Sequence, residues 1–588
     1  MKQFLKFTLA SCLGLFIGMA LLTIGFFIFI AMLGSGSGKS TSVSSNSILE
    51  LNFDTPVPER TNNVSRDIFA TNDVIGLQDW VAAIRNAKTD PKIKGIFIKS
   101  QGLGTGQASA YVMRQALLDF KKSGKFITAY ADYYTQGSFY MASVADTIWI
   151  NPKGAFDFRG FASMIPFFKD MLDKIGVKPE AFYVGKFKSA TEPYRFNKMS
   201  DENRLQTREY IEGLYGIYLQ DISGSRNIPV ATLREIASKI QGRDPDDALR
   251  LGLVDAIGYY DQVLADLSKR TGVKKAEDLN LVKMSTYHSS YKKKYSSSKN
   301  KIAVVNAEGI IQYSSESNPG SINTDQYTKL LREIRADKDI KAIVMRVNSG
   351  GGDALTSEMI WRELELAKAQ GIKVVASMGD LAASGGYYIS CNADSIFAQP
   401  NTITGSIGVF GLKFNMTELF NQKLGIHFDT VATSASAAGF TPFFNTSAEE
   451  AVATQMMVDS IYNDFISRVA AGRGKTKAEI HEIAQGRVWT GKKAVELGLV
   501  DRIGGYDDAV ECAARMAKVK DYKIIEYPKV KEPIEQFMEQ FMDTESRAKS
   551  SIIKAEMGDL YPVYEQFKAL SEFKGVQARL PWVVSYNW

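Results

Sequence analysis

The chain after residue 47 contains the same pattern of sequence twice. Three blocks recur in the same order, and their spacing stays between 246 and 248 residues. The matching blocks are 90–98 with 337–345, 145–149 with 393–397, and 251–258 with 497–504. A period of this length is that of a whole domain, so it indicates a tandem duplication and not a solenoid of short repeats. At 588 residues the chain is also too long for a single core.

Short β-branched runs alternate with helical patterns inside each copy. In the second copy, residues 303–305, 342–347 and 374–378 have the composition of buried strands. Between them, residues 327–334 and 358–369 place apolar side chains at helical spacing. This alternation predicts βαβ units, and therefore an α/β fold in which helices cover a parallel sheet.

The N-terminus carries an apolar segment preceded by lysines. No charge occurs in residues 7–33, although Lys2 and Lys6 stand just before them. A helix needs about 20 apolar residues to cross a bilayer, and the apolar core of a signal peptide is shorter. We expect a cytoplasmic N-terminus over 1–6, a single transmembrane signal anchor over 7–33, and a flexible Gly/Ser-rich stalk over 34–47, with the remainder outside the cytoplasm.

Composition changes mark the other boundaries. We expect a first repeat over 48–285, a solvated linker over 286–301 that contains three consecutive lysines and three consecutive serines, and a second repeat over 302–527. A helical tail is expected over 528–588. Its apolar stripe has i, i+3, i+4, i+7, i+8 spacing and consists of Ile534, Phe537, Met538, Phe541 and Met542. The stripe fits ordinary packing, an oligomer contact or a membrane-surface helix, and the sequence does not separate these.

Composition also excludes several classes of function. The net charge of +6 arises from 71 basic and 65 acidic residues without a long basic stripe, which argues against nucleic-acid binding. Three cysteines make neither a disulfide framework nor a metal cluster. The three histidines, His288, His427 and His481, stand beside no motif. If the chain is an enzyme, its general base is therefore a residue of another type.

One serine has the surroundings of a nucleophile. Residues 379–388 read Gly-Asp-Leu-Ala-Ala-Ser-Gly-Gly-Tyr-Tyr and place Ser384 just after a predicted strand. Small neighbours let a substrate backbone approach, and the N–H groups of a following helix can face a developing oxyanion. An ordinary Gly-rich turn at a helix start is the alternative, and it is the commoner explanation for such a segment taken alone.

A second Gly-rich turn follows another strand. Residues 346–353 read Arg-Val-Asn-Ser-Gly-Gly-Gly-Asp. Two such turns in one parallel sheet can bring backbone amides together, so Gly351 or Gly352 can supply one oxyanion donor and Gly385 the other. A phosphate-binding loop is disfavoured, because no Gly-Lys-Ser/Thr follows.

These motifs resemble the signal peptide peptidase A family, serine protease family S49. The resemblance rests on residues 383–388, 348–352 and 404–408 (Thr-Gly-Ser-Ile-Gly) together with the repeated Gly-Leu-Val-Asp blocks, and it spans roughly 48–525. It implies a tandem duplication of a domain with the fold of Clp-type proteases and crotonases, and two copies imply the long form of the family. The family usually has Ser-Pro-Gly-Gly where this chain has Ser349 and three glycines.

The resemblance also assigns roles to residues. The segment 183–193 is similar to the family's Tyr-Lys-Ser-Ala-x-Glu-Pro, which makes Lys188 the general base and not Lys186. Ser384 is then the nucleophile, and Ser406 matches a serine that orients the lysine. A lysine accepts a proton only as the neutral amine, so its usual pKa of about 10.4 has to be lowered by burial. No cofactor or metal is implied.

The duplication divides this site between the copies. Gln136 aligns with Ser384, so the first copy lacks the nucleophile, and residues 433–437 (Thr-Ser-Ala-Ser-Ala) align with the lysine segment, so the second copy lacks the base. One composite site per chain is expected, within one chain or across neighbours. The resemblance implies released signal peptides as substrates, homotetramers, and a bacterial inner-membrane location with the catalytic part facing the periplasm or exterior.

Two other functions compete with this interpretation. A crotonase-like enzyme acting on acyl-CoA would share the fold and the oxyanion hole, but it needs neither Ser384 nor an anchor. A catalytically inactive scaffold of the envelope would not need Ser384 and Lys188 in complementary copies.

Overall fold

The computed structural model describes residues 6, 13–25, 43–61, 74–291, 296–314, 320–529 and 576–579. Residues 13–25 of the expected anchor are helical and exposed, and the rest of segment 7–33 lies outside the described residues, as does the tail stripe at 534–542. Within the described ranges, no helix combines the length and apolar character needed to span a bilayer.

The first repeat is built on a parallel six-stranded sheet with the order β6-β4-β3-β2-β1-β7. Its strands are β1 (Ser47–Leu51), β2 (Ile93–Lys99), β3 (Phe126–Tyr134), β4 (Thr147–Phe156), β6 (Ala256–Ile257) and β7 (Leu281–Lys283). Its helices are α2 (Leu77–Thr89), α3 (Gln107–Lys121), α4 (Gln136–Ala142), α5 (Lys169–Ile175), α6 (Glu192–Arg195), α7 (Asp201–Arg226), α8 (Val230–Ser238), α9 (Pro245–Arg250), α10 (Tyr260–Thr271) and α11 (Met284–Ser290). Two short 3-10 turns complete it, η1 (Ser189–Thr191) and η2 (Ala276–Asp278).

The second repeat has an eight-stranded sheet in which the path β18-β14-β13-β11-β8-β19 reproduces the strand order of the first. These strands are β8 (Lys301–Glu308), β11 (Ile340–Ser349), β13 (Lys373–Ala383), β14 (Ser395–Ala398), β15 (Ile403–Gly405), β17 (Val488–Thr490), β18 (Arg502–Ile503) and β19 (Lys523–Tyr527). The helices are α12 (Thr324–Ala336), α13 (Ala354–Ala369), α14 (Gly385–Tyr388), α15 (Ala448–Arg473), α16 (Lys477–Ile483), α17 (Gly491–Glu496), α18 (Tyr506–Met516) and the π-helical turn η3 (Leu419–Leu424). The duplication predicted from sequence is therefore visible as one strand order that occurs in both sheets.

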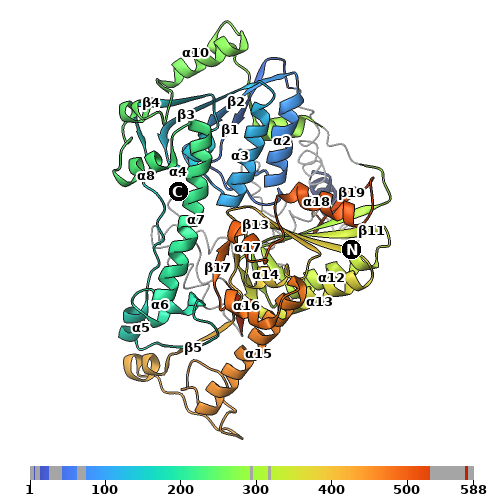
Figure 1. The fold of residues 1–588 in the computed structure, drawn as a ribbon. Helices are drawn as coiled ribbons and strands as arrows, with labels where there is room; N and C mark the ends of the chain where they lie inside the picture. Colours follow the sequence, from blue (N-terminus) through green and yellow to red (C-terminus); the bar gives the residue numbers. More distant parts are fainter. Residues whose placement is uncertain are drawn as a thin grey trace.

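A third sheet combines both repeats and carries the site. Its order is β10-β9-β12-β20-β16-β5. Its strands are β5 (Lys178–Tyr183), β9 (Ile310–Gln312), β10 (Ser321–Asn323), β12 (Gly351–Asp353), β16 (Phe410–Asn415) and β20 (Gln577–Arg579). Only β5 comes from the first repeat. This strand lies below the lower end of the long helix α7, where the first repeat contacts the second (Figure 1).

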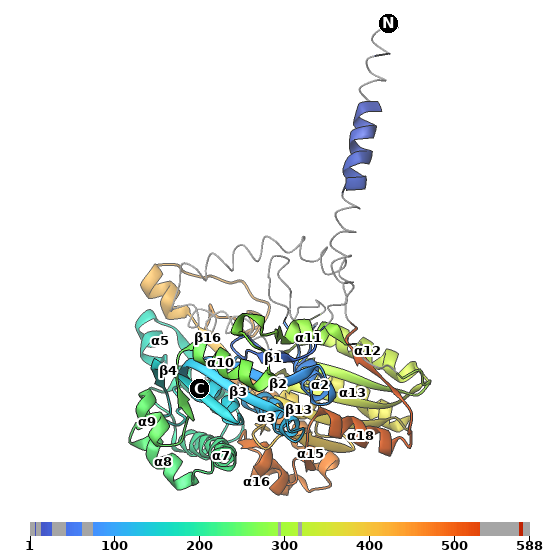
Figure 2. The same ribbon diagram turned by 90° about the horizontal axis from the view of Figure 1, so that it is seen from above.

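The two repeats lie side by side, with α5, α8 and α9 of the first at one end and α12, α13 and α18 of the second at the other (Figure 2). Each has its own hydrophobic core. A buried ion pair joins them: Nε and Nη2 of Arg346 each donate to a carboxylate oxygen of Glu59 at 2.9 Å. The Asp380 carboxylate also accepts hydrogen bonds from the amide (2.9 Å) and hydroxyl (2.5 Å) of Ser109. These contacts fix the repeats relative to each other.

Candidate active site

Ser384 lies in the turn between β13 and α14. Its side chain is fully buried, and its amide donates to the carbonyl of Gly405 at 2.8 Å. The backbone of this serine has φ 55° and ψ −117°, a conformation that few residues other than glycine adopt. Strain of this kind persists only where the surroundings enforce it, and it concentrates at functional sites. The sharp turn brings Ser384 Oγ toward the segment contributed by the first repeat.

Lys188 arrives from the first repeat, just after β5. Its Nζ lies 3.0 Å from Ser384 Oγ and 3.1 Å from Ser406 Oγ. The same ammonium nitrogen lies 3.4 Å from the carbonyl of Ser406 and 2.6 Å from that of Arg579. The structure therefore brings together Lys188, Ser384 and Ser406 within one chain, at the positions that sequence analysis selected.

The environment of Lys188 favours its neutral form. The side chain is 1% exposed, and each of these four contacts is to a hydroxyl or a carbonyl. Burial lowers the pKa of the Lys188 ammonium to about 7. A substantial fraction of the amine is then unprotonated near neutral pH and able to accept a proton.

The backbone around Lys188 is held from both repeats. Gln485 of the second repeat accepts from the Phe187 amide at 3.0 Å, and the Gln206 side chain donates to the Phe187 carbonyl at 2.9 Å. Gly486 passes so close that a Cβ on it would lie 2.6 Å from Lys188 Cβ. A side chain there would displace the lysine. Neither Gln206 nor Gly486 belongs to a motif, so nothing in the sequence marks them as part of the site.

Pairing of β5 with β16 carries the lysine segment to the serine. The two strands run antiparallel, with Tyr183 opposite Phe410 and Lys178 opposite Asn415. At the far end the Asn415 side chain donates to Glu180 at 3.0 Å.

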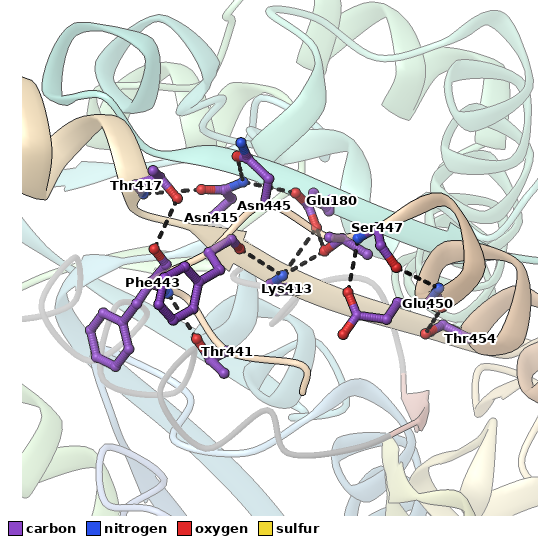
Figure 3. Close-up of polar contacts among 12 residues, drawn as sticks. Glu180, Lys413, Asn415, Thr417, Thr441, Phe443, Asn445, Ser447, Glu450 and Thr454 are labelled. Carbon is purple, nitrogen blue, oxygen red and sulfur yellow. Dashed lines mark hydrogen bonds and ion pairs between the residues drawn. The ribbon is translucent and has the colours of Figure 1, made fainter. Parts of the chain in front are cut away.

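A buried lysine reinforces this pairing (Figure 3). Lys413 Nζ lies 2.5 Å from Thr446 Oγ1 and 3.6 Å from a Glu180 carboxylate oxygen, and the Thr446 hydroxyl itself donates to Glu180. Lys413 is 5% exposed, so this network is only partly screened by water. It connects the strand before Lys188 to the segment that leads into α15.

The predicted oxyanion glycines lie together beside Ser384. A Cβ on Gly351 would lie 2.6 Å from the amide nitrogen of Gly385, which stands in the first turn of α14, where N–H groups have no intrahelical acceptor. The Gly351 amide donates to Ser349 Oγ at 3.1 Å. Gly352 follows it in β12. Among these three, the amide of Gly351 is thus already engaged inside its own loop.

One protein-family profile matches the chain twice. Peptidase family S49 matches residues 119–274 and 366–520, which together are more than half of the chain. The chain belongs to peptidase family S49. This S49 peptidase is therefore a serine-type peptidase, and one of the two profile matches falls within each repeat.

Curated relatives agree with that assignment. "Protease 4" of Salmonella typhi is 37% identical over 529 residues, covering 85% of this chain and 84% of the relative. "Putative signal peptide peptidase SppA" of Enterococcus faecium is 37% identical over 233 residues, covering 39% of this S49 peptidase and 67% of the relative. The long relative is matched across both repeats.

A solved structure of a ClpP1 mutant from Listeria monocytogenes also matches, with 16% identity over 35% of this chain and 94% of its own. Its TM-score of 0.23 is too low to support a conclusion. The expected kinship with Clp-type proteases and crotonases therefore stays a prediction, whereas the mixed α/β fold with parallel sheets is observed.

Proposed function

We propose that this S49 peptidase is a membrane-anchored endopeptidase that uses a Ser384–Lys188 dyad to degrade released signal peptides, and misfolded envelope segments as well. The observation that carries the proposal is the buried Lys188 Nζ, 3.0 Å from Ser384 Oγ. A crotonase-like reaction would leave this pair without a role, and an inactive scaffold would have no need to bury an amine.

In the proposed reaction, neutral Lys188 takes the proton from Ser384 Oγ as this oxygen attacks a peptide carbonyl. The protonated amine then delivers that proton to the leaving nitrogen. Water activated by the same amine hydrolyses the acyl-enzyme. The hydroxyl of Ser406, 3.1 Å from Nζ, orients the amine between these steps.

Backbone amides would stabilise the negative charge of the tetrahedral intermediate. Gly385, Gly351 and Gly352 are the candidate donors, and the Gly351 amide becomes available only if it releases Ser349. All three are glycines, so a substrate backbone can approach without meeting a side chain.

The anchor and the location rest on the sequence. Residues 7–33 carry no charge, and Lys2 and Lys6 favour a cytoplasmic N-terminus. We place the segment in the bacterial inner membrane with both repeats facing the periplasm or exterior. Protease protection in right-side-out vesicles tests this: the repeats should be digested without detergent, and full protection would contradict the orientation.

Assembly into a homo-oligomer, a tetramer by family resemblance, is also proposed. In the first repeat the arm containing β5 is covered by the second repeat, whereas the equivalent arm of the second repeat exposes apolar side chains. These include Leu424, Ile426, Val431 and Phe440, which are 56%, 46%, 102% and 50% exposed. In the oligomer, the first repeat of a neighbouring chain would cover these side chains. Light scattering should give a mass of several chains that falls in a V431D/F440D double variant, and a monomeric wild-type chain would contradict the assembly.

Covalent labelling tests the nucleophile directly. A fluorophosphonate probe should modify Ser384, since an activated serine attacks phosphorus, and the labelled peptide can be mapped by mass spectrometry. S384A and K188A should both lose the label. A label on another serine would refute the dyad.

The substrate class requires a separate measurement. Full-length protein in phospholipid vesicles should fragment a synthetic signal peptide, whereas S384A should leave it intact. Digestion of a folded control protein at the same rate would contradict a preference for free peptides.

A further inference from the structure

The side chain of Gln206 is enclosed where α7 of the first repeat runs beside β17 of the second (Figure 1). It is 1% exposed. Its Nε2 donates to the carbonyl of Phe187 at 2.9 Å and to Ser189 Oγ at 3.0 Å. Its Oε1 accepts a hydrogen bond from the amide of Val488 at 3.3 Å. One carboxamide therefore contacts both the segment that follows β5 and a strand of the second repeat.

Lys188 stands between the two residues to which Gln206 donates. The amide of Ser189 donates to the carbonyl of Phe187 at 2.8 Å, and Lys188 has φ −76° and ψ 73°. These are the hydrogen bond and the dihedral angles of an inverse γ-turn with Lys188 at its centre. Because Gln206 binds the first carbonyl of this turn and the hydroxyl of its last residue, it fixes both ends of the turn that presents the lysine side chain.

The strand on the other side of this carboxamide leads to the nucleophile. Val488 is the first residue of β17, and it stands opposite Gly405 of β15 in an antiparallel pair. The Gly405 carbonyl accepts the hydrogen bond from the Ser384 amide at 2.8 Å. The Ser406 amide donates to the carbonyl of Arg487 at 2.7 Å. Both serines that contact the lysine amine are therefore held through the segment that this carboxamide binds.

The start of α7 is itself bonded to the lysine segment. Ser200 caps the helix by accepting from the Asn203 amide at 3.1 Å. The buried Glu192 carboxylate accepts from the Ser200 hydroxyl at 2.6 Å and from Asn203 Nδ2 at 2.9 Å. Asn203 Oδ1 lies 3.4 Å from Gln206 Nε2. Gln206 thus projects from a helix end that is tied to Glu192, four residues after the lysine.

We propose that Gln206 is a positioning residue of the peptidase reaction, which holds the turn at Lys188 against the strand that holds Ser384 and so sets the approach of Nζ to Oγ. This role rests on the proposed Ser384–Lys188 dyad, because Gln206 acts through Lys188. Proton transfer needs the two atoms within hydrogen-bond reach. A displacement of about 1 Å caused by a change outside the reacting groups can cost about a hundredfold in rate. The carboxamide should therefore affect the chemical step and leave peptide affinity unchanged.

Replacing the carboxamide by an unbranched apolar side chain of similar length tests this role. Q206M keeps most of the side-chain volume and removes its hydrogen bonds. We expect kcat for a fluorogenic peptide to fall by about 10- to 100-fold, while KM stays within about twofold. An unchanged kcat, or a loss that is confined to KM, would overturn the proposal.

A buried amide elsewhere supplies the matched control for lost stability. Asn306 in β8 is 4% exposed, and its Nδ2 donates to the Tyr527 carbonyl at 3.2 Å. N306L should lower the melting temperature, as the loss of a buried hydrogen bond does, and leave kcat within about twofold. If N306L loses as much kcat as Q206M at an equal fall in melting temperature, the effect of Q206M is structural and the proposal is overturned.

The pH dependence separates an effect on the base from a general loss of structure. In Q206M the released turn lets Lys188 Nζ gain contact with water, so its pKa should rise from about 7 toward the ordinary value of about 10.4. The midpoint of kcat/KM against pH should move upward, and the deficit relative to the wild type should be larger at pH 7 than at pH 9. N306L should keep the wild-type midpoint. A midpoint that stays near 7 in Q206M would show that the carboxamide does not act through the base, against the proposal.

S189A is a milder variant in case Q206M does not fold. It removes one of the two acceptors at the turn and leaves the Phe187 carbonyl in place. We expect kcat to fall by about two- to fivefold, with the pH midpoint shifted in the same direction. If only S189A folds, a wild-type kcat and midpoint in this variant would overturn the proposal.

K188A and S384A distinguish a failure of this role from a failure of the dyad. If both variants lack activity while Q206M matches the wild type, the dyad stands and the role of Gln206 is wrong. If either variant keeps full activity, the dyad itself is wrong, and the role of Gln206 fails with it.

Discussion

The turn at Ser384 and the equivalent turn at Gln136 show what separates the repeat that carries the candidate nucleophile from the repeat that does not. Ser384 has φ 55° and precedes the short helix α14. In the first repeat the helix α4 starts at Gln136 itself, after Thr135 caps it by accepting from the Ser138 amide. The Gln136 side chain then accepts from the amides of Arg159 (3.1 Å) and Gly160 (2.7 Å). The space a substrate would use is closed by the repeat's own hydrogen bonds.

The arms that leave the two repeats differ in the opposite way. In the first repeat the arm forms β5 and brings Lys188 to Ser384 of the second repeat. In the second, residues 426–437 form no strand and are exposed over their whole length. In the proposed dyad each repeat supplies one of the two residues, so we expect the loss of either residue to abolish activity.

The largest effect should come from the residue that differs between the turns. We expect S384A to lower kcat/KM by at least about 10⁴-fold, because the nucleophile is lost. The matched change in the other copy, Q136A, should leave kcat/KM within about twofold. Hydrolysis of a fluorogenic peptide measures both. A loss in Q136A comparable with that in S384A, without a change in melting temperature, would show that the first turn is not inactive.

The next effect concerns the contact that fixes the copies together. E59A leaves the buried Arg346 guanidinium without its carboxylate, which should cost about 3–5 kcal/mol of unfolding free energy. Denaturant titration followed by circular dichroism measures it. The control is E235A, which removes an ion pair with Lys239 whose side chains are 57% and 59% exposed. That change should have no measurable effect. Equal midpoints for the two variants would mean that the repeats are not locked through Glu59.

The smallest effect is the dependence of kcat/KM on pH, which we attribute to Lys188 of the first repeat. Below the Lys188 pKa of about 7 the amine is increasingly protonated and unable to act as a base. We therefore expect log kcat/KM to rise by about one for each pH unit below 7 and to level off above it. Q136A should show the same curve. A midpoint near the ordinary lysine pKa of about 10.4 would contradict the proposed role of Lys188.

Sequence analysis predicted the duplicated α/β fold and the residues that meet at the site. The reason is that the spacing of the repeat and the Gly-rich turns can be read directly from the linear sequence. Lys188 could be chosen only through resemblance, since an isolated lysine has no local signature. Its contact with Ser384 depends on the antiparallel pairing of β5 with β16, strands that are more than 200 residues apart.

Other features had no signal that could be read in advance. β20 has three residues, which is too short for a periodic pattern, and no sequence pattern predicts its pairing with β12 and β16. The engagement of the Gly351 amide by Ser349 also depends on the folded loop. A helical tail was expected over 528–588. Of this range the structure describes residues 528–529 and 576–579, and among them residues 577–579 form a strand paired with the second repeat. Tertiary pairing decides such short segments, and local propensity does not.

The division of the site between repeats sets an order of events during synthesis. Lys188 leaves the ribosome 196 residues before Ser384, which corresponds to roughly 10–40 s of elongation at 5–20 residues per second. A first repeat that has already folded holds an amine without a nucleophile, so a nascent chain cannot digest itself or its neighbours. Residues 576–579, which lie across the finished site, follow Ser384 by almost as many residues as Ser384 follows Lys188. Both residues of the pair are therefore made before the strand that lies over them.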